Sequence, residues 1–249
     1  MKLRPLPCGW LTGPRAGFFE GEDGRLRVPV WAWAIEHPKG TVVFDAGMHP
    51  DVATDPEARL GRLAKVFDAE YSAAETVGAR LEQAGLDPTR VDWLVNSHLH
   101  FDHAGGNAEI PNARLVVQEA EWRAGADPDL AARNGFDPRD YDLGHDVLCV
   151  RGEHDLFGDG LVTCIPTHGH TPGHQSLRVR LAEGEYVLTS DACYLRRTLE
   201  ELHLPGVVHD REAMLDSLHR LRALEAAGAK LLFGHDPEQA GTLPAWFGE

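Results

Sequence analysis

The stretch SHLHFDHAGG, residues 97–106, decides the fold and the chemistry of this chain. Within six residues it places three imidazoles and a carboxylate, His98, His100, Asp102 and His103, and two glycines follow soon after. Buried polar groups need partners, so this cluster is hard to explain except as a metal site. Imidazole nitrogen and carboxylate oxygen suit zinc well, and also iron, cobalt or manganese.

The spacing predicts two metal positions rather than one. Residues 91–96 are predicted to form a buried strand. Continued through His98 and His100, this strand would place both side chains on one face, because strand residues alternate between faces. Asp102 and His103 would then lie in the following loop and reach a second point nearby, since the glycines allow a tight turn.

The pattern H-x-H-x-D-H of residues 98–103 resembles the mark of the metallo-β-lactamase superfamily. The resemblance implies a further His, a bridging Asp and a last His, each at the end of a later strand. The chain supplies them in order as His170 in THGHTPGHQS (167–176), Asp191 in EYVLTSD (185–191) and His235 in KLLFGHD (230–236).

The family pattern divides these residues between two metals. It assigns His98, His100 and His170 to one metal, and Asp102, His103 and His235 to the other. Asp191 would bridge them. The implied cofactor is a pair of zinc ions per chain, with cobalt, iron or manganese as alternatives. Asp45, at the end of an early predicted strand, corresponds to an acid that orients the ligands in this superfamily.

Three further side chains near these motifs have open roles. Cys193 lies two residues after Asp191 and could face the site, although a small packed thiol is favoured. His174 either donates a hydrogen bond to a metal ligand or has a purely structural role with its own hydrogen bonds, and the second interpretation is favoured. The role of His168 stays open.

Two more segments narrow the resemblance. HTPGHQSL (170–177) and SDACY (190–194), together with residues 98–107, look like the quorum-quenching N-acyl-homoserine lactone lactonases. The resemblance runs from about Val28 to Asp236. In those enzymes a Tyr shortly after the bridging Asp contacts the substrate carbonyl oxygen, and Tyr194 holds that place.

The activity implied is opening of a lactone ring by a hydroxide activated between two metals. Tyr194 would stabilise the oxyanion, and Asp102 would carry the proton from the nucleophile to the leaving alkoxide. Residues 1–27 and 52–71 match weakly, so acyl-chain preference stays open. Four aromatic residues are candidates for the acyl pocket wall, although ordinary core positions are favoured for them: Phe18, Phe19, Phe67 and Tyr71.

The fold implied is an α/β fold, the αββα sandwich, with two mixed sheets flanked by helices. Residues 1–249 are predicted to form a single domain, because the strands ending near Asp45, Thr167 and the ligand residues must converge on one site. Helices are expected at 72–84, 119–125 and 210–227. Residues 127–144 are expected to form a surface loop with short helical turns.

Composition excludes several classes of partner. The formal charge of −15 repels phosphate backbones, which argues against a nuclease and against nucleic acid as a partner. No apolar stretch is long enough for a signal peptide or a membrane span. The four cysteines are expected to be reduced thiols in a cytoplasmic protein. The expected partner is a small lactone, and the chain is either a monomer or a homodimer.

Other activities on this scaffold also stay open. A glyoxalase II-like thioesterase would share the ligands and need a basic patch, for which Arg196 and Arg197 are the candidates. A general lactonase or esterase is closer still. A single-iron dioxygenase uses only part of the ligand set. A non-catalytic binding protein would be expected to have lost some of the ligands. The full set of ligands in this sequence disfavours both alternatives.

Overall fold

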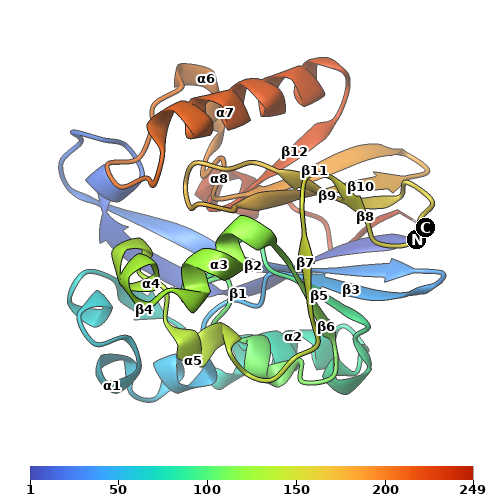
Figure 1. Cartoon of the computed structure of the whole chain (residues 1–249), viewed down its shortest axis with the longest axis horizontal. Coiled ribbons are helices and arrows are strands. Elements are labelled where there is room, and N and C mark those ends of the chain that lie inside the picture. Colours follow the sequence, from blue (N-terminus) through green and yellow to red (C-terminus); the bar gives the residue numbers. More distant parts are fainter. Residues whose placement is uncertain (249) are drawn as a thin grey trace.

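Two β-sheets pack face to face in the computed structural model, which describes residues 1–248, and helices cover the outer faces of both (Figure 1). Within the described chain, the larger sheet has the strand order β13-β1-β2-β3-β5-β6-β7, with β4 paired to β1. Its strands are β1 (Lys2–Pro14), β2 (Arg25–His37), β3 (Gly40–Phe44), β4 (Asp68–Glu70), β5 (Trp93–Val95), β6 (Arg114–Gln118), β7 (Val147–Val150) and β13 (Phe247–Gly248).

The smaller sheet has the order β12-β11-β10-β9-β8. Its strands are β8 (His154–Asp155), β9 (Val162–Pro166), β10 (Gln175–Leu181), β11 (Gly184–Ser190) and β12 (Lys230–Phe233). Both sheets are mixed, since β3, β5, β6 and β7 pair in parallel in one sheet and β11 and β12 in the other. This architecture is the expected αββα sandwich.

The helices lie in two groups outside the sheets. Those beside the larger sheet are α1 (Pro56–Leu60), α2 (Val77–Gln83), α3 (Glu119–Ala126), α4 (Pro128–Asn134) and α5 (Pro138–Tyr141). Figure 1 shows α6 (Arg196–Glu201) and α7 (Arg211–Ala226) above the smaller sheet, and α8 (Pro237–Ala240) follows β12. Short 3-10 turns occur at Arg15–Gly17, Pro50–Ala53, Leu63–Lys65, Ala73–Glu75, Pro88–Arg90 and Asn107–Glu109. None of the helices in residues 1–248 is long and apolar enough to cross a membrane.

Helix α7 follows the prediction closely. The Asp210 side chain accepts a hydrogen bond from the Ala213 N–H, which is an N-cap. Met214, Leu218 and Leu221 recur at helical spacing and are fully buried against the smaller sheet.

The helix expected at 72–84 is shorter than predicted. Thr76 has extended backbone angles, and its hydroxyl accepts from the Ala79 N–H, so α2 begins only at Val77. Residues 127–144 form the expected short helical turns. Asp127 and Asp137 each act as the N-cap of a helix whose first residue is Pro.

The strand before the first histidines ends earlier than predicted. β5 stops at Val95, so His98 and His100 lie in the following loop and not on a strand face. The backbone at Ser97 leaves the ladder of the larger sheet: its N–H donates to Oδ1 of Asp45, which follows β3, and its carbonyl accepts from the N–H of Gln175 in β10. These contacts tie the loop to residues from both sheets.

Candidate metal centre

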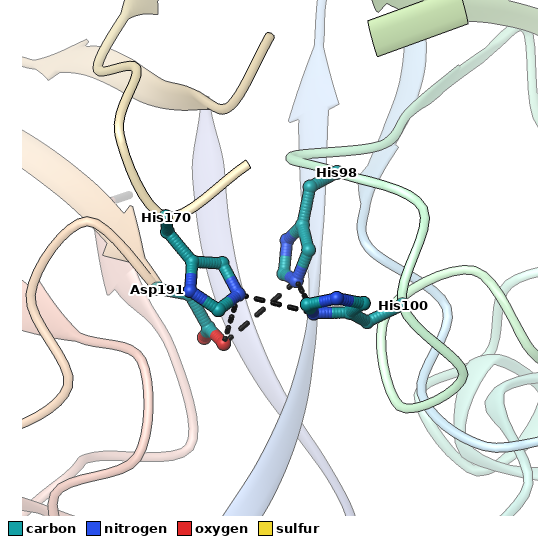
Figure 2. Close-up of side chains that lie close together, drawn as sticks. All are labelled: His98, His100, His170 and Asp191. Atoms are coloured by element: carbon teal, nitrogen blue, oxygen red, sulfur yellow. Dashed lines mark hydrogen bonds and ion pairs between the residues drawn. The ribbon is translucent and has the colours of Figure 1, made fainter. Parts of the chain in front are cut away.

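Four predicted ligands from three loops converge in one group (Figure 2). His98 and His100 follow β5, His170 follows β9 and Asp191 follows β11. The distance from His100 Nδ1 is 2.9 Å to His98 Nε2 and 3.0 Å to His170 Nε2. Asp191 Oδ2 lies 3.3 Å from His170 Nε2 and 3.7 Å from His98 Nε2.

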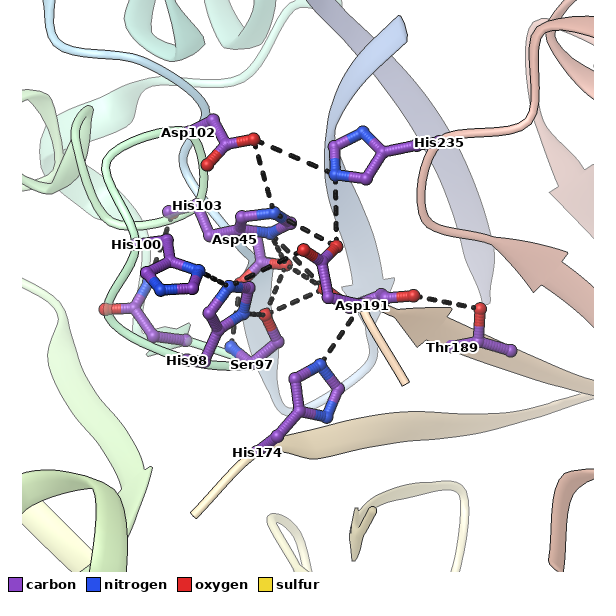
Figure 3. Close-up of polar contacts among 12 residues, drawn as sticks. Asp45, Ser97, His98, His100, Asp102, His103, His174, Thr189, Asp191 and His235 are labelled. Atoms are coloured by element: carbon purple, nitrogen blue, oxygen red, sulfur yellow. Dashed lines mark hydrogen bonds and ion pairs between the residues drawn. The ribbon is translucent and has the colours of Figure 1, made fainter. Parts of the chain in front are cut away.

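The remaining predicted ligands form a second group on the other side of Asp191 (Figure 3). Asp191 Oδ1 lies 3.0 Å from His235 Nε2 and 3.2 Å from His103 Nε2. Asp102 Oδ2 lies 3.8 Å and 3.7 Å from the same two nitrogens. Each oxygen of Asp191 therefore faces a different group. The structure thus brings all seven predicted residues together.

Hydrogen bonds on the far side of three of the imidazoles fix the ring proton. His100 Nε2 lies 2.7 Å from the Asn134 carbonyl, and His235 Nδ1 lies 2.7 Å from the Pro29 carbonyl. A carbonyl only accepts, so these nitrogens carry the ring proton and the opposite nitrogen presents a lone pair to the centre of its group. His103 Nδ1 similarly donates to Asp45 Oδ2 at 2.9 Å.

This arrangement fits divalent metal ions. Lone pairs of several imidazoles and carboxylate oxygens point at common centres, where they repel one another unless a cation lies between them. Within residues 1–248, His103 Nε2 and Asp191 Oδ1 are buried without a hydrogen-bond partner. Burial also holds the pKa values of His98 and His170 well below the usual value, which keeps both rings neutral and able to coordinate.

Asp45 lies behind both groups, as the resemblance implies. Besides the bond from His103, its carboxylate accepts from the Ser97 hydroxyl at 2.8 Å and the Ser190 hydroxyl at 3.1 Å. Ser97 Oγ in turn lies 2.9 Å from His98 Nδ1. Neither serine was identified from the sequence, although each directly precedes a predicted ligand. Asp45 and Ser190 also adopt positive φ angles of 57° and 46°.

Tyr194 lies beside the first group. Its hydroxyl is 3.1 Å from His170 Nδ1. If His170 presents Nε2 to a metal, Nδ1–H donates to the Tyr194 oxygen and leaves the phenol proton free to donate elsewhere. Burial, followed by the nearby carboxylates, raises the pKa of Tyr194 well above its usual value, so the hydroxyl keeps this proton.

The four aromatic candidates for the pocket wall all belong to the main core cluster, as favoured from the sequence. Phe18 and Phe19 are buried in it, and Phe67 and Tyr71 pack against it. Phe18 also reaches the site: its ring packs edge-on against the rings of Tyr194 and His235, at centroid distances of 5.5 Å and 6.3 Å.

The open roles of the neighbouring residues are also resolved in part. Cys193 is a packed thiol, buried in the cluster beneath α6 and α7. His174 is hydrogen-bonded structure, with its Nε2 accepting from the Asp191 N–H at 3.1 Å and its Nδ1 3.0 Å from the Thr167 hydroxyl. His168 is not part of either ligand group.

The arginine pair that an anion-binding thioesterase would need is already engaged. Arg196 pairs with Glu225 at 2.6 Å. Arg197 pairs with Glu22 at 2.6 Å and Glu201 at 2.8 Å. Neither guanidinium is left without a carboxylate partner.

Comparison with known proteins gives consistent results. The model of the metallo-beta-lactamase superfamily matches residues 25–235. The N-acyl homoserine lactonase AttM of Azorhizobium caulinodans is 36% identical over 88% of this chain and 86% of its own length. The N-acyl homoserine lactonase AiiA of Bacillus thuringiensis subsp. kurstaki is 30% identical, over 86% of this chain and 84% of its own length.

A solved structure agrees with these relatives. An N-acyl homoserine lactone hydrolase, with the product N-hexanoyl-L-homoserine bound at its catalytic metal centre, has a TM-score of 0.87 and 26% identity. The match covers 98% of this chain and 96% of that one. The two-sheet sandwich, the ligand motif in the loops and the matched residues lead to one conclusion: the chain belongs to the metallo-beta-lactamase superfamily.

Proposed function

We propose that this protein is a metal-dependent hydrolase that opens the lactone ring of N-acyl homoserine lactones and so quenches quorum sensing. The observation that carries the proposal is the Tyr194 hydroxyl, 3.1 Å from His170 Nδ1 and next to a cluster of seven His and Asp side chains. The similarity to lactonases along most of the chain supports it. The arginine pair engaged by carboxylates disfavours a thioesterase of the glyoxalase II type.

The proposed ligands are the seven residues of the two groups, with Asp191 shared. Zinc is the favoured metal, with cobalt, iron or manganese as alternatives. Two such ions, when bound, would activate a water as the nucleophile at neutral pH and polarise the lactone carbonyl. These seven proposed ligands are His98, His100, Asp102, His103, His170, Asp191 and His235.

Asp102 is the proposed proton carrier. Its side chain is 12% exposed, against 3% for His103 and His235, so it is the member of the second group most open to substrate. As the new C–O bond forms, Asp102 takes the proton of the attacking water. It returns that proton to the ring oxygen as the ring C–O bond breaks, which leaves an N-acyl homoserine.

Tyr194 is the proposed donor to the carbonyl oxygen. Its hydroxyl remains protonated, accepts from His170 and donates to the oxygen that gains negative charge during attack. A fixed donor of this kind contributes about 3 kcal/mol to lowering the barrier.

The test is ring opening followed in a pH-stat with protein purified in zinc or cobalt. Substrates are N-acyl homoserine lactones of short to long acyl chains, beside a thioester and a nitrocefin-like β-lactam. Lactone opening with little action on the other two supports the proposal. A protein that carries two metals and opens no lactone contradicts it, and one iron per chain would point to a dioxygenase.

A further inference from the structure

Glu121 is a buried carboxyl that the proposed chemistry does not use. It lies in the first turn of α3 and is 0% exposed. Among residues 1–248, no Lys, Arg or His forms an ion pair with it, unlike the partly exposed Glu119 of the same turn, which pairs with Arg123 and Arg151. Burying a carboxyl without a cation is costly, so its hydrogen bonds must stabilise it.

Both oxygens of Glu121 accept backbone N–H groups from loops that carry proposed ligands. Oε1 accepts from Leu99, at 3.1 Å, and Oε2 accepts from Gly173, at 2.7 Å. Leu99 lies between His98 and His100, and Gly173 is three residues after His170. One loop follows β5 of the larger sheet and the other follows β9 of the smaller sheet. The carboxyl therefore links the two sheets at the metal centre.

Close packing leaves this link little freedom. A Cβ on Gly173 would lie 2.2 Å from the Glu121 backbone nitrogen, and a Cβ on Gly125 of α3 would lie 2.8 Å from Leu99 Cδ1. Helix α3 thus lies directly against both loops. A Gln at position 121 would have the same shape, but its amide NH2 would face one of the two N–H groups, whereas the ionised carboxylate accepts at both oxygens.

We propose that Glu121 is a positioning residue that sets the separation of His98 and His100 from His170. This inference rests on the proposed metal-dependent function. Glu121 acts through the backbone of Leu99 and Gly173 and touches no ligand side chain. Its two bonds are made next to the ligands of the first group, and no hydrogen bond described in residues 1–248 joins it to Asp102, His103 or His235, so we expect its effect to fall mainly on one of the two metal positions.

The test compares metal binding by wild type, Glu121→Gln and the matched control Glu119→Gln, which changes a partly exposed carboxyl of the same helix. Affinities come from competition with a chromophoric chelator, and cobalt absorption spectra report the geometry of each site. Work at pH 8 keeps Glu121 ionised, since burial raises the pKa of this carboxyl to about 7. Circular dichroism verifies that each variant is folded.

We expect Glu121→Gln to weaken one of the two binding steps by about 10–100-fold and to change the cobalt spectrum of that site. The other step and the Glu119→Gln protein should match wild type. Glu121→Asp keeps the charge but is too short to reach both N–H groups, so it should show a smaller loss at the same site. This variant serves as the test if Glu121→Gln does not fold.

Unchanged affinities, or an equal loss at both sites, in a folded variant would overturn the inference. Lactone assays on wild type separate it from the proposed function. If the wild type binds two metals but opens no lactone, the proposed substrate is wrong. The metal-binding comparison still tests the role of Glu121 in that case. A wild type that binds no metal contradicts both.

Discussion

Asp191 presents one oxygen to each of two groups of imidazoles, at 3.0 to 3.7 Å from the nitrogens. Removing this carboxylate should therefore weaken metal binding at both positions. We expect Asp191→Ala to lose metal on dialysis, measured by elemental analysis per mole of chain. Glu185→Ala, which changes a partly exposed acid near the start of β11, the strand before Asp191, should retain metal. A fully loaded and active Asp191→Ala protein would contradict the bridging role.

Tyr194 should affect turnover without affecting metal content. Its hydroxyl hydrogen-bonds to the outer nitrogen of His170 and is not itself among the ligand atoms. We expect Tyr194→Phe to lower kcat by tens-fold or more, about a hundred-fold for a full oxyanion donor. The alkaline limb of the pH profile should keep its position, because the pKa of Tyr194 lies well above its usual range.

Steady-state kinetics and elemental analysis test this prediction. Tyr186→Phe is the control, since Tyr186 is also buried but its hydroxyl contacts Lys230, far from the ligands in the sandwich. Wild-type turnover in Tyr194→Phe would remove Tyr194 from the mechanism.

Among the elements, the loop after β9 depends on its contact with α7. A Cβ on Gly169 would lie 2.2 Å from the Met214 nitrogen, and the φ of +126° at Gly169 disfavours any side chain. We expect Gly169→Ala to lower the free energy of unfolding by roughly 2–5 kcal/mol and to weaken metal binding at His170. Urea unfolding and chelator competition measure the two effects.

Gly184 provides the matched control for this loop. It is the first residue of β11 and has a similar φ of +143°, but open space surrounds its Cβ position. Gly184→Ala should lower the free energy of unfolding only by the backbone strain, about 1–3 kcal/mol, and should leave metal affinity unchanged. Equal effects of the two substitutions would show that the contact with α7 is unimportant.

The sequence was most informative where chemistry is concentrated in a short pattern. Residues 98–103 gave the ligand types, and the apolar runs before Asp191 and His235 correspond to β11 and β12. The predicted extent of β5 is wrong because the Ser97 N–H donates to the side chain of Asp45, a residue distant in sequence, and not to a neighbouring strand. Glu121 could not be found from the sequence, since its partners are backbone groups of two remote loops.

At the scale of the molecule, the proposed ligands come from loops of both sheets. His98 and His103 lie in the loop after β5 of the larger sheet, and His170, Asp191 and His235 lie in loops after β9, β11 and β12 of the smaller one. Metal should therefore stabilise the whole fold, by about 2.7 kcal/mol at a free metal concentration 100 times Kd. Calorimetry should show a Tm lower by roughly 5–10 °C after treatment with a chelator. A Tm that does not respond to the chelator would contradict this expectation.

We also propose that residues 1–249 form one cooperative domain. A single core cluster contains Trp33 and Phe44 of the larger sheet together with Leu177 and Leu188 of the smaller sheet. The metal-free protein should therefore unfold in one transition, with equal calorimetric and van't Hoff enthalpies. Two resolved transitions would instead indicate that the sheets belong to separate domains.

The positive φ angles of Asp45 and Ser190 have a consequence for attempts to engineer heat-resistant variants. Each left-handed residue without glycine's freedom costs about 1–2 kcal/mol, and both occur where a strand runs into the site. Glycine at either position would relax the backbone but remove a side chain that orients the histidines. Selection for thermal survival should therefore retain Asp45 and Ser190 despite the strain, because glycine at position 45 would leave the Ser97 N–H and the His103 Nδ1–H buried without an acceptor.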